Sequence, residues 1–214
     1  MDNELLSKVF KWFGIGLLVT FVIAYLVSTN ITMLTFVGNN FLIIGILEIV
    51  CALWLSFRIY KMPSTTAIML YLGYAVLTGL TFSSIFIVYQ MISIIYVFLA
   101  TAIVFGVFSI IGKNTNVNLN KFGIYLAVAL LSVIVLELIN LFLMNGTLDL
   151  FLCSISIMIF IGYVAYDMQK IYKIYNYVDD DRVDNLAIIG AFNIYLDFIN
   201  LFIRLLRLFG KSRD

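Results

Sequence analysis

The sequence predicts an all-α integral membrane protein with seven transmembrane helices. Three observations support this: the composition, seven apolar stretches of spanning length, and an alternation of basic and uncharged loops. The 214 residues are 64% hydrophobic and 12% charged, whereas a soluble domain is about half apolar and about a quarter charged. The net charge of +1 gives no electrostatic case for a nucleic-acid partner. Membrane lipids are therefore the first partners that we expect.

Seven stretches are long enough to cross a bilayer, which takes about 20 mostly apolar residues. The first follows Lys8 and Lys11 and has no small-residue cleavage site after it, so it is a span and not a signal peptide. The apolar run from 66 to 112 is too long for one helix, and we divide it at Gln90. The predicted spans of this single transmembrane domain, 1–214, are about 9–28, 41–60, 66–89, 91–112, 122–144, 148–175 and 185–209.

The basic residues predict the orientation, because cytoplasmic loops carry an excess of Lys and Arg. They flank every second loop and the N-terminus, at Lys8, Lys11, Arg58, Lys61, Lys113, Lys121, Lys170, Lys173 and Arg182. This alternation places the N-terminus in the cytoplasm, and seven spans then place the C-terminus outside. The tail is nevertheless rich in Arg and Lys. The seventh helix therefore either crosses against the rule or enters and returns, and we favour crossing because earlier loops usually fix topology.

A polar stripe runs along the seventh span. Asn193, Asp197, Asn200, Arg204 and Arg207 follow one another at intervals of four, three, four and three, which is one face of a helix. An ionised side chain at the bilayer centre costs at least about 2.5–3.5 kcal/mol, so such residues face protein or water. Asp197 lies about 12 residues into its span, or roughly 18 Å along the helix, near mid-membrane.

A second aspartate is the predicted partner of Asp197. Asp167 lies in the preceding, antiparallel span, on a face shared with Ser156, Tyr163 and Lys170. Two facing aspartates in a dry site do not readily both ionise, so one keeps a proton unless a cation is near. The chain has no histidine, so proton chemistry falls to carboxylates. The pair is thus a candidate pH-sensitive latch, and its oxygens suit hard cations such as calcium.

The other intramembrane polar groups have structural alternatives. Asn193 and Asn200 either line an ion pathway or hydrogen-bond neighbouring helices, and Glu48 is equally open to both interpretations. We interpret Glu137 as structural. Arg204 and Arg207 lie in the last turns, where long side chains reach lipid headgroups, and we expect them to be anchors.

Four segments resemble the Bax inhibitor family, the transmembrane Bax-inhibitor-motif proteins. "YLDFINLFIRLLRLFG" (195–210) is similar to its C-terminal signature, and "YVAYDMQKI" (163–171) resembles its sixth-helix motif. "ILEI" (46–49) and "TGLTFSSI" (78–85) match more weakly. The resemblance covers the whole chain in length and span count.

The resemblance implies a seven-helix bundle whose C-terminal helix is central, and a pH-sensitive calcium leak in bacterial members. The family's paired aspartates fall on Asp167 and Asp197, its latch arginine most nearly on Arg58, and a family glutamate on Glu48. The interval from Glu48 to Arg58 is one residue shorter than the family pattern, which rotates Arg58 by about 100°. Ser84 stands where many relatives have a proline, so we expect no proline kink there.

The leading hypothesis is a calcium leak channel gated by protonation of Asp167 and Asp197, with calcium as the permeant ion and no other cofactor. The alternative is a non-conducting regulator that binds a membrane-embedded protease, a role to which some bacterial family members are linked. We expect no enzyme, because no G-x-S-x-G, H-E-x-x-H or G-x-G-D motif is present. The composition, rich in Ile, Asn, Lys and Tyr, suggests a bacterial source and hence the plasma membrane.

Overall fold

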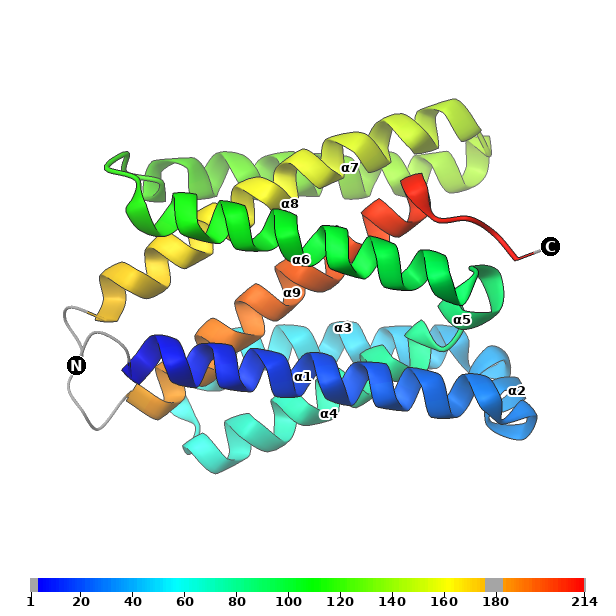
Figure 1. The fold of residues 1–214 in the computed structure, drawn as a ribbon, viewed down its shortest axis with the longest axis horizontal. Coiled ribbons are helices and arrows are strands. Elements are labelled where there is room, and N and C mark those ends of the chain that lie inside the picture. The colour runs from blue at the N-terminus through cyan, green and yellow to red at the C-terminus, as the bar shows by residue number, and fades with distance from the viewer. Residues whose placement is uncertain (1–3, 176–182, 214) are drawn as a thin grey trace. The chain divides into compact units, whose positions relative to one another are not determined.

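The computed structural model describes residues 4–175 and 183–213, so Arg182 lies outside the described residues. The described chain is helical, with short connections (Figure 1). In chain order the helices are α1 (Glu4–Thr29), α2 (Ile31–Asn39), α3 (Phe41–Arg58), the 3₁₀ turn η1 (Ile59–Lys61), α4 (Ser64–Phe82), α5 (Ile85–Val88), α6 (Met91–Asn114), α7 (Asn120–Leu143), α8 (Gly146–Tyr175) and α9 (Val183–Phe209).

Seven helical segments of the described chain are long and apolar enough to cross a membrane, with α4 and α5 together forming one. This confirms the predicted fold class, and each predicted span overlaps one of the seven. α9 is by far the most buried, with 67% of its apolar window inside the protein against 39% at most for any other. Such burial is what a central C-terminal helix requires.

The chain forms two compact units, and α9 contributes to both. The first unit comprises Met1–Met91, Tyr177–Tyr195 and Ser212–Asp214, and the second comprises Ile92–Asn176 and Leu196–Lys211. The single domain expected from the sequence stays a prediction.

In the first unit α1 packs closely against α4, and α3 also packs against α4. Glu48 of α3 accepts a hydrogen bond from Thr78 of α4. Gly79 permits the close approach, because a Cβ at that position would overlap the Thr20 carbonyl and the Ile23 side chain of α1. The Thr20 hydroxyl donates to the Ala75 carbonyl oxygen at 3.0 Å and shares a 2.6 Å hydrogen bond with the Tyr195 hydroxyl of α9. Hydrogen bonds between polar groups thus join α1, α4 and α9 in the buried interior of the first unit.

An aromatic cluster attaches α9 to α4 in the same unit. Tyr71 and Tyr74 meet Phe192 and Tyr195 edge to face, with ring centroids 5.3–6.2 Å apart. Edge-to-face pairs of this kind add about 0.5–1.5 kcal/mol each beyond the area that they bury.

Two local features differ from the sequence expectations. Helix α2 was not predicted; it begins because the Asn30 side chain accepts hydrogen bonds from the Thr32 and Met33 amides, a standard N-cap. The third span is interrupted between Phe82 and Ile85 although no proline is present. There the Ser84 hydroxyl donates to the Thr81 carbonyl oxygen at 2.8 Å, and such serine back-bonding competes with the helix ladder.

In the second unit α7 and α8 form an antiparallel hairpin (Figure 1). Val133, Leu152 and Ile159 are the buried centre of their contact. α7 ends at Met144, whose φ of 50° is left-handed and whose amide closes the last turn onto the Asn140 carbonyl oxygen. A left-handed residue of this kind is a common way to end a helix.

α6 packs against both α8 and the second half of α9. A Cβ at Gly112 would overlap the Ala165 backbone of α8, so only glycine permits this helix contact. Phe105 packs edge to face on Phe198 of α9, with ring centroids 5.6 Å apart. These contacts fix the helices that carry the candidate site.

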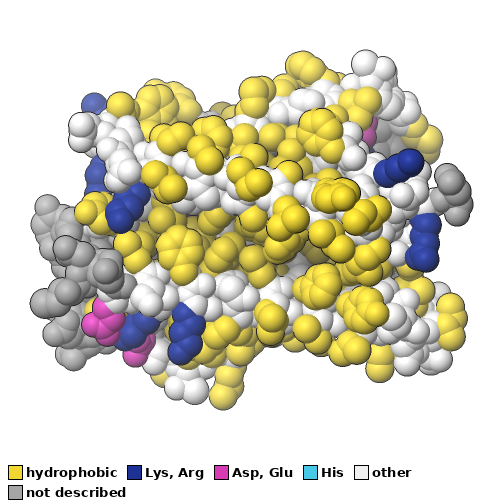
Figure 2. Space-filling view, in the orientation of Figure 1, with side chains coloured by type: hydrophobic (Ala, Val, Ile, Leu, Met, Phe, Trp, Pro, Cys, Tyr) yellow, Lys and Arg dark blue, Asp and Glu magenta, His cyan; other side chains and the backbone are white. Residues whose placement is uncertain are grey.

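Large hydrophobic side chains cover the exposed faces of the helices, whereas Lys, Arg, Asp and Glu side chains gather near the helix ends (Figure 2). In water such surfaces would cause aggregation, but in a bilayer they are the lipid-facing sides of the spans. The surface therefore agrees with the multi-pass membrane character of the chain.

Candidate functional site: a buried pair of aspartates

The second unit brings Asp167 of α8 and Asp197 of α9 together. Their carboxyl groups lie close enough for each to act on the other. Both residues are buried, with exposed fractions of 8% and 5%. The predicted contact between these two spans is therefore present, and neither carboxyl group faces the lipid side.

The apolar pattern of each helix places its aspartate inside. On α8, Val164, Met168 and Ile171 are buried at the helical spacing that brackets Asp167. On α9, Phe198 and Leu201 are buried next to Asp197. Since the hydrophobic effect drives these faces inward, the acidic side chains are carried into the interior with them.

One oxygen of the pair requires a partner that the protein does not supply. Asp197 Oδ2 is fully buried and has no hydrogen-bond donor among the described residues. Two carboxylate oxygens repel each other at short range, so the arrangement calls for a proton or a cation between them. Either one would compensate the charge of the buried pair.

Lys170 is the basic group that acts on Asp167. It lies one turn further along α8, and its charge interacts with the Asp167 carboxyl group, while its Nζ lies 5.9 Å from the Tyr166 ring centroid. The Tyr163 side chain interacts with both aspartates. Ser156, expected on the same face, instead donates to the Leu152 carbonyl oxygen of its own helix.

Gln169 holds the C-terminal part of this helix in place, and the sequence analysis missed it. The side chain is buried, accepts from the Leu119 amide at 2.9 Å and donates to the Val117 carbonyl oxygen at 2.8 Å. It thereby ties the α6–α7 loop to α8 only two residues from Asp167. The sequence alone does not indicate this role, because the loop that Gln169 binds lies about 50 residues earlier in the chain.

Two further sequence candidates, Arg58 and Glu48, belong to the first unit. Arg58 is exposed at the end of α3 in the first unit and forms no ion pair within the described chain, so its latch role stays a prediction. Glu48 accepts hydrogen bonds from Thr78 at 2.8 Å and Thr81 at 3.3 Å, which is a helix-to-helix contact of the first unit.

The two asparagines of the stripe differ in their surroundings. Asn193 is half-buried and belongs to the first unit. Asn200 is half-buried in the second unit, where its Nδ2 donates to the Leu196 carbonyl oxygen at 2.7 Å. Since this bond lies within one turn of α9, Asn200 keeps its carboxamide oxygen for another partner, and its place on an ion pathway stays a prediction.

The acidic pair offers two ligands to a metal ion. Within the part of the chain that the structure describes, no group of three or more His, Cys, Asp or Glu side chains could hold a metal. Calcium takes 6–8 oxygen ligands, so most ligands at Asp167 and Asp197 would be water or carbonyl oxygens.

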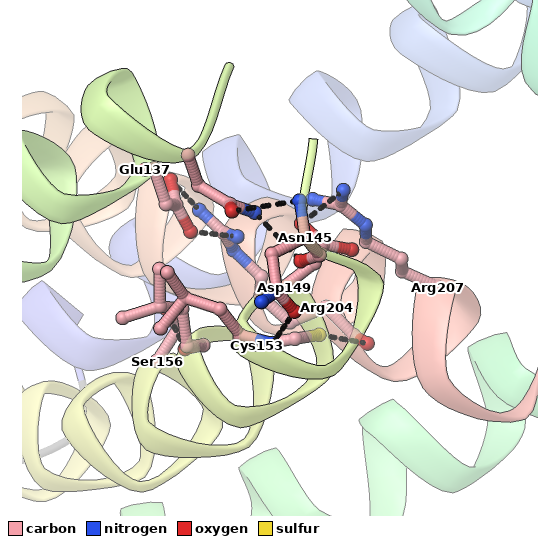
Figure 3. Close-up of polar contacts among 10 residues, drawn as sticks. Glu137, Asn145, Asp149, Cys153, Ser156, Arg204 and Arg207 are labelled. Atoms are coloured by element: carbon pink, nitrogen blue, oxygen red, sulfur yellow. Dashed lines mark hydrogen bonds and ion pairs between the residues drawn. The ribbon is translucent and has the colours of Figure 1, made fainter. Parts of the chain in front are cut away.

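A second charged cluster lies at the end of α9, beyond the aspartates (Figure 3). Arg204 forms a two-pronged ion pair with Glu137 of α7, in which Nη2 lies 2.9 Å from Oε2. Arg207 donates to Asp149 of α8 at 2.5 Å. The Arg204 guanidinium is engaged by Glu137, a contact that agrees with the structural interpretation of Glu137, and the expected anchor role of Arg204 and Arg207 stays a prediction.

Together these features define a multi-pass α-helical membrane protein with a buried acidic pair that involves its most buried helix. The model of the family described as "Inhibitor of apoptosis-promoting Bax1" matches residues 2–214. The chain belongs to this family, the Bax inhibitor family.

Bacterial relatives match over nearly their whole length. The inner membrane protein YbhL of Escherichia coli strain K12 is 37% identical over 214 residues, which cover 97% of this chain and 92% of YbhL. A protein of Borreliella burgdorferi is 36% identical over 219 residues, covering 100% of this chain and 94% of its own. A membrane protein of Streptococcus pyogenes serotype M3 is 32% identical, covering 98% and 93%.

Proposed function

We propose that the protein is a pH-sensitive calcium leak of the bacterial plasma membrane, gated by protonation of Asp167 and Asp197. The observation that carries the proposal is the contact of these two carboxyl groups in the protein interior. A purely structural link between α8 and α9 would need only neutral amides, which hold helices together at lower desolvation cost.

The gate follows from the two ways in which the pair can be neutralised. With a proton between the carboxyl groups, α8 and α9 are joined by a hydrogen bond and the site carries little charge to attract a cation. After the proton leaves, the like charges separate unless a cation compensates them. Calcium and the Lys170 ammonium group then compete for the same oxygens, so proton concentration controls how long calcium occupies the site.

The test is calcium flux into proteoliposomes that contain only this protein and lipid, measured across a pH series. Wild type should give a flux that changes with pH, and Asp167→Asn or Asp197→Asn should flatten that change, because an amide neither titrates nor carries charge. Asp184→Asn is the matched control: it makes the same chemical change in the exposed first turn of α9 and should keep the wild-type profile.

Two outcomes contradict the proposal. An unchanged pH profile in Asp197→Asn removes the pair from the gate even if calcium passes. No flux at any pH removes the leak itself, and co-purification of a membrane protease in that case supports the non-conducting regulator.

A further inference from the structure

The charged cluster at the end of α9 borders an open hollow of about 590 Å³ within the second unit. Its walls come from the last turns of α7, the α7–α8 turn and the first turn of α8, and Arg207 of α9 completes it. Because α7 ends at Leu143 and α8 begins at Gly146, the hollow lies where two spans leave the hydrocarbon. That is the depth of the lipid headgroups.

Two residues that line the hollow, Arg207 and Asp149, keep hydrogen-bonding groups that are not used within the described chain. Arg207 uses a single N–H on Asp149 Oδ1, and its other N–H groups have no hydrogen-bond partner in the described chain. Asp149 Oδ2 likewise has none there. A guanidinium has five N–H donors and an ionised carboxylate accepts on both oxygens, so a positive and a negative group remain available side by side.

An apolar track leads away from this floor along α7. Ile134, Leu138 and Leu141 line the hollow, follow the i, i+4, i+7 spacing of one helix face, and are exposed. An acyl chain can lie along this track while its headgroup occupies the hollow.

The geometry points to a binding site for a zwitterionic phospholipid with a primary ammonium group, such as phosphatidylethanolamine. Arg207 donates to the lipid phosphate, as guanidinium groups do to planar and tetrahedral anions. Asp149 accepts from the ammonium, which adjoins the phosphate in the same headgroup. The acyl chain follows Ile134, Leu138 and Leu141.

Charge complementarity separates this ligand from the alternatives. A free metal cation offers no acceptor to the unused N–H groups of Arg207, which a phosphate does. A phosphatidylglycerol headgroup offers no cation to Asp149. A phosphatidylcholine headgroup carries its charge on methyl groups that cannot donate a strong hydrogen bond. The site thus predicts selectivity among phospholipids and is independent of the proposed calcium path.

The test is native mass spectrometry of the detergent-purified protein with equal amounts of phosphatidylethanolamine, phosphatidylglycerol and phosphatidylcholine. Wild type should retain phosphatidylethanolamine most strongly. Arg207→Gln should weaken its binding about tenfold, the effect of losing one charge-assisted hydrogen bond, and Asp149→Asn should abolish the preference over phosphatidylglycerol. Lys121→Gln removes the same charge at the other end of α7, where Lys121 is exposed, and should leave retention unchanged.

Gly146→Phe tests the hollow without touching either ion pair. Gly146 lines the hollow, and a Cβ there meets no atom within 4 Å, so this position can take a large side chain at the wall of the hollow. Retention of phosphatidylethanolamine should fall about tenfold. Equal retention of all three lipids by wild type overturns the proposal. So does unchanged retention in Gly146→Phe, which decides the matter even if Arg207→Gln does not fold.

Discussion

Replacing Arg204 with glutamine should destabilise the protein by about 3 kcal/mol, much more than replacing Arg207. Arg204 meets Glu137 through two charge-assisted hydrogen bonds, and the two side chains are only 17% and 26% exposed. Bonds to charged groups contribute about 1.5–3 kcal/mol each, and partial exposure lowers their sum. Arg207 makes one bond to Asp149 and is 45% exposed, so its loss should cost about 0.5–1 kcal/mol.

The assay is the thermal midpoint in detergent, where each kcal/mol corresponds to about 2–4 °C for a chain of this length. Arg204→Gln should therefore lower the midpoint by roughly 6–12 °C and Arg207→Gln by no more than about 4 °C. The double variant Arg204→Gln/Glu137→Gln should lose less than the sum of the single variants, with a coupling energy of about 1–3 kcal/mol. Equal shifts for Arg204→Gln and Arg207→Gln, or strictly additive losses in the double variant, would refute this reasoning.

Two more predictions concern packing and orientation. Gly112→Leu should lower the thermal midpoint strongly, because its Cβ would overlap the Ala165 backbone. Gly146→Leu is the control: a Cβ at Gly146 meets open space, so the midpoint should change little. Similar shifts for the two variants would show that the α6–α8 contact is not tight. A cysteine at Arg213, in a background without Cys51 and Cys153, should react with an impermeant maleimide added to intact spheroplasts, and labelling only after lysis would place the C-terminus inside.

The span count could be predicted because it depends on composition and length alone. The contact between Asp167 and Asp197 could be predicted too, since consecutive antiparallel helices are neighbours and two acidic residues must avoid lipid. The resemblance of the C-terminal motif to the Bax inhibitor family implied which helix would be most buried. These inferences use local patterns, which the sequence displays directly.

Other features depend on which surfaces meet. Arg204 and Glu137 are 67 residues apart and Arg207 and Asp149 are 58 apart, and each residue alone reads equally well as a headgroup anchor. The break after Phe82 follows from serine hydroxyls that turn back on their own helix, a choice that the hydrophobic pattern does not encode. Arg58 is the opposite case: the match to a family motif suggests a latch role, but Arg58 forms no ion pair within the described part of its own unit.

Arg204 and Arg207, at the end of α9, bear on both the predicted topology and the buried aspartates. Glu137 and Asp149 form ion pairs with Arg204 and Arg207 near the α7–α8 turn, but the positive-inside rule counts Lys and Arg and not net charge, so the tail arginines still weigh against an outside C-terminus. The same pairing withdraws both guanidinium groups from Asp197, which lies roughly 10 Å away from Arg204 along the helix. Lys170 then remains the basic group that acts on Asp167, and a bound proton is the other way in which the buried pair can lose charge.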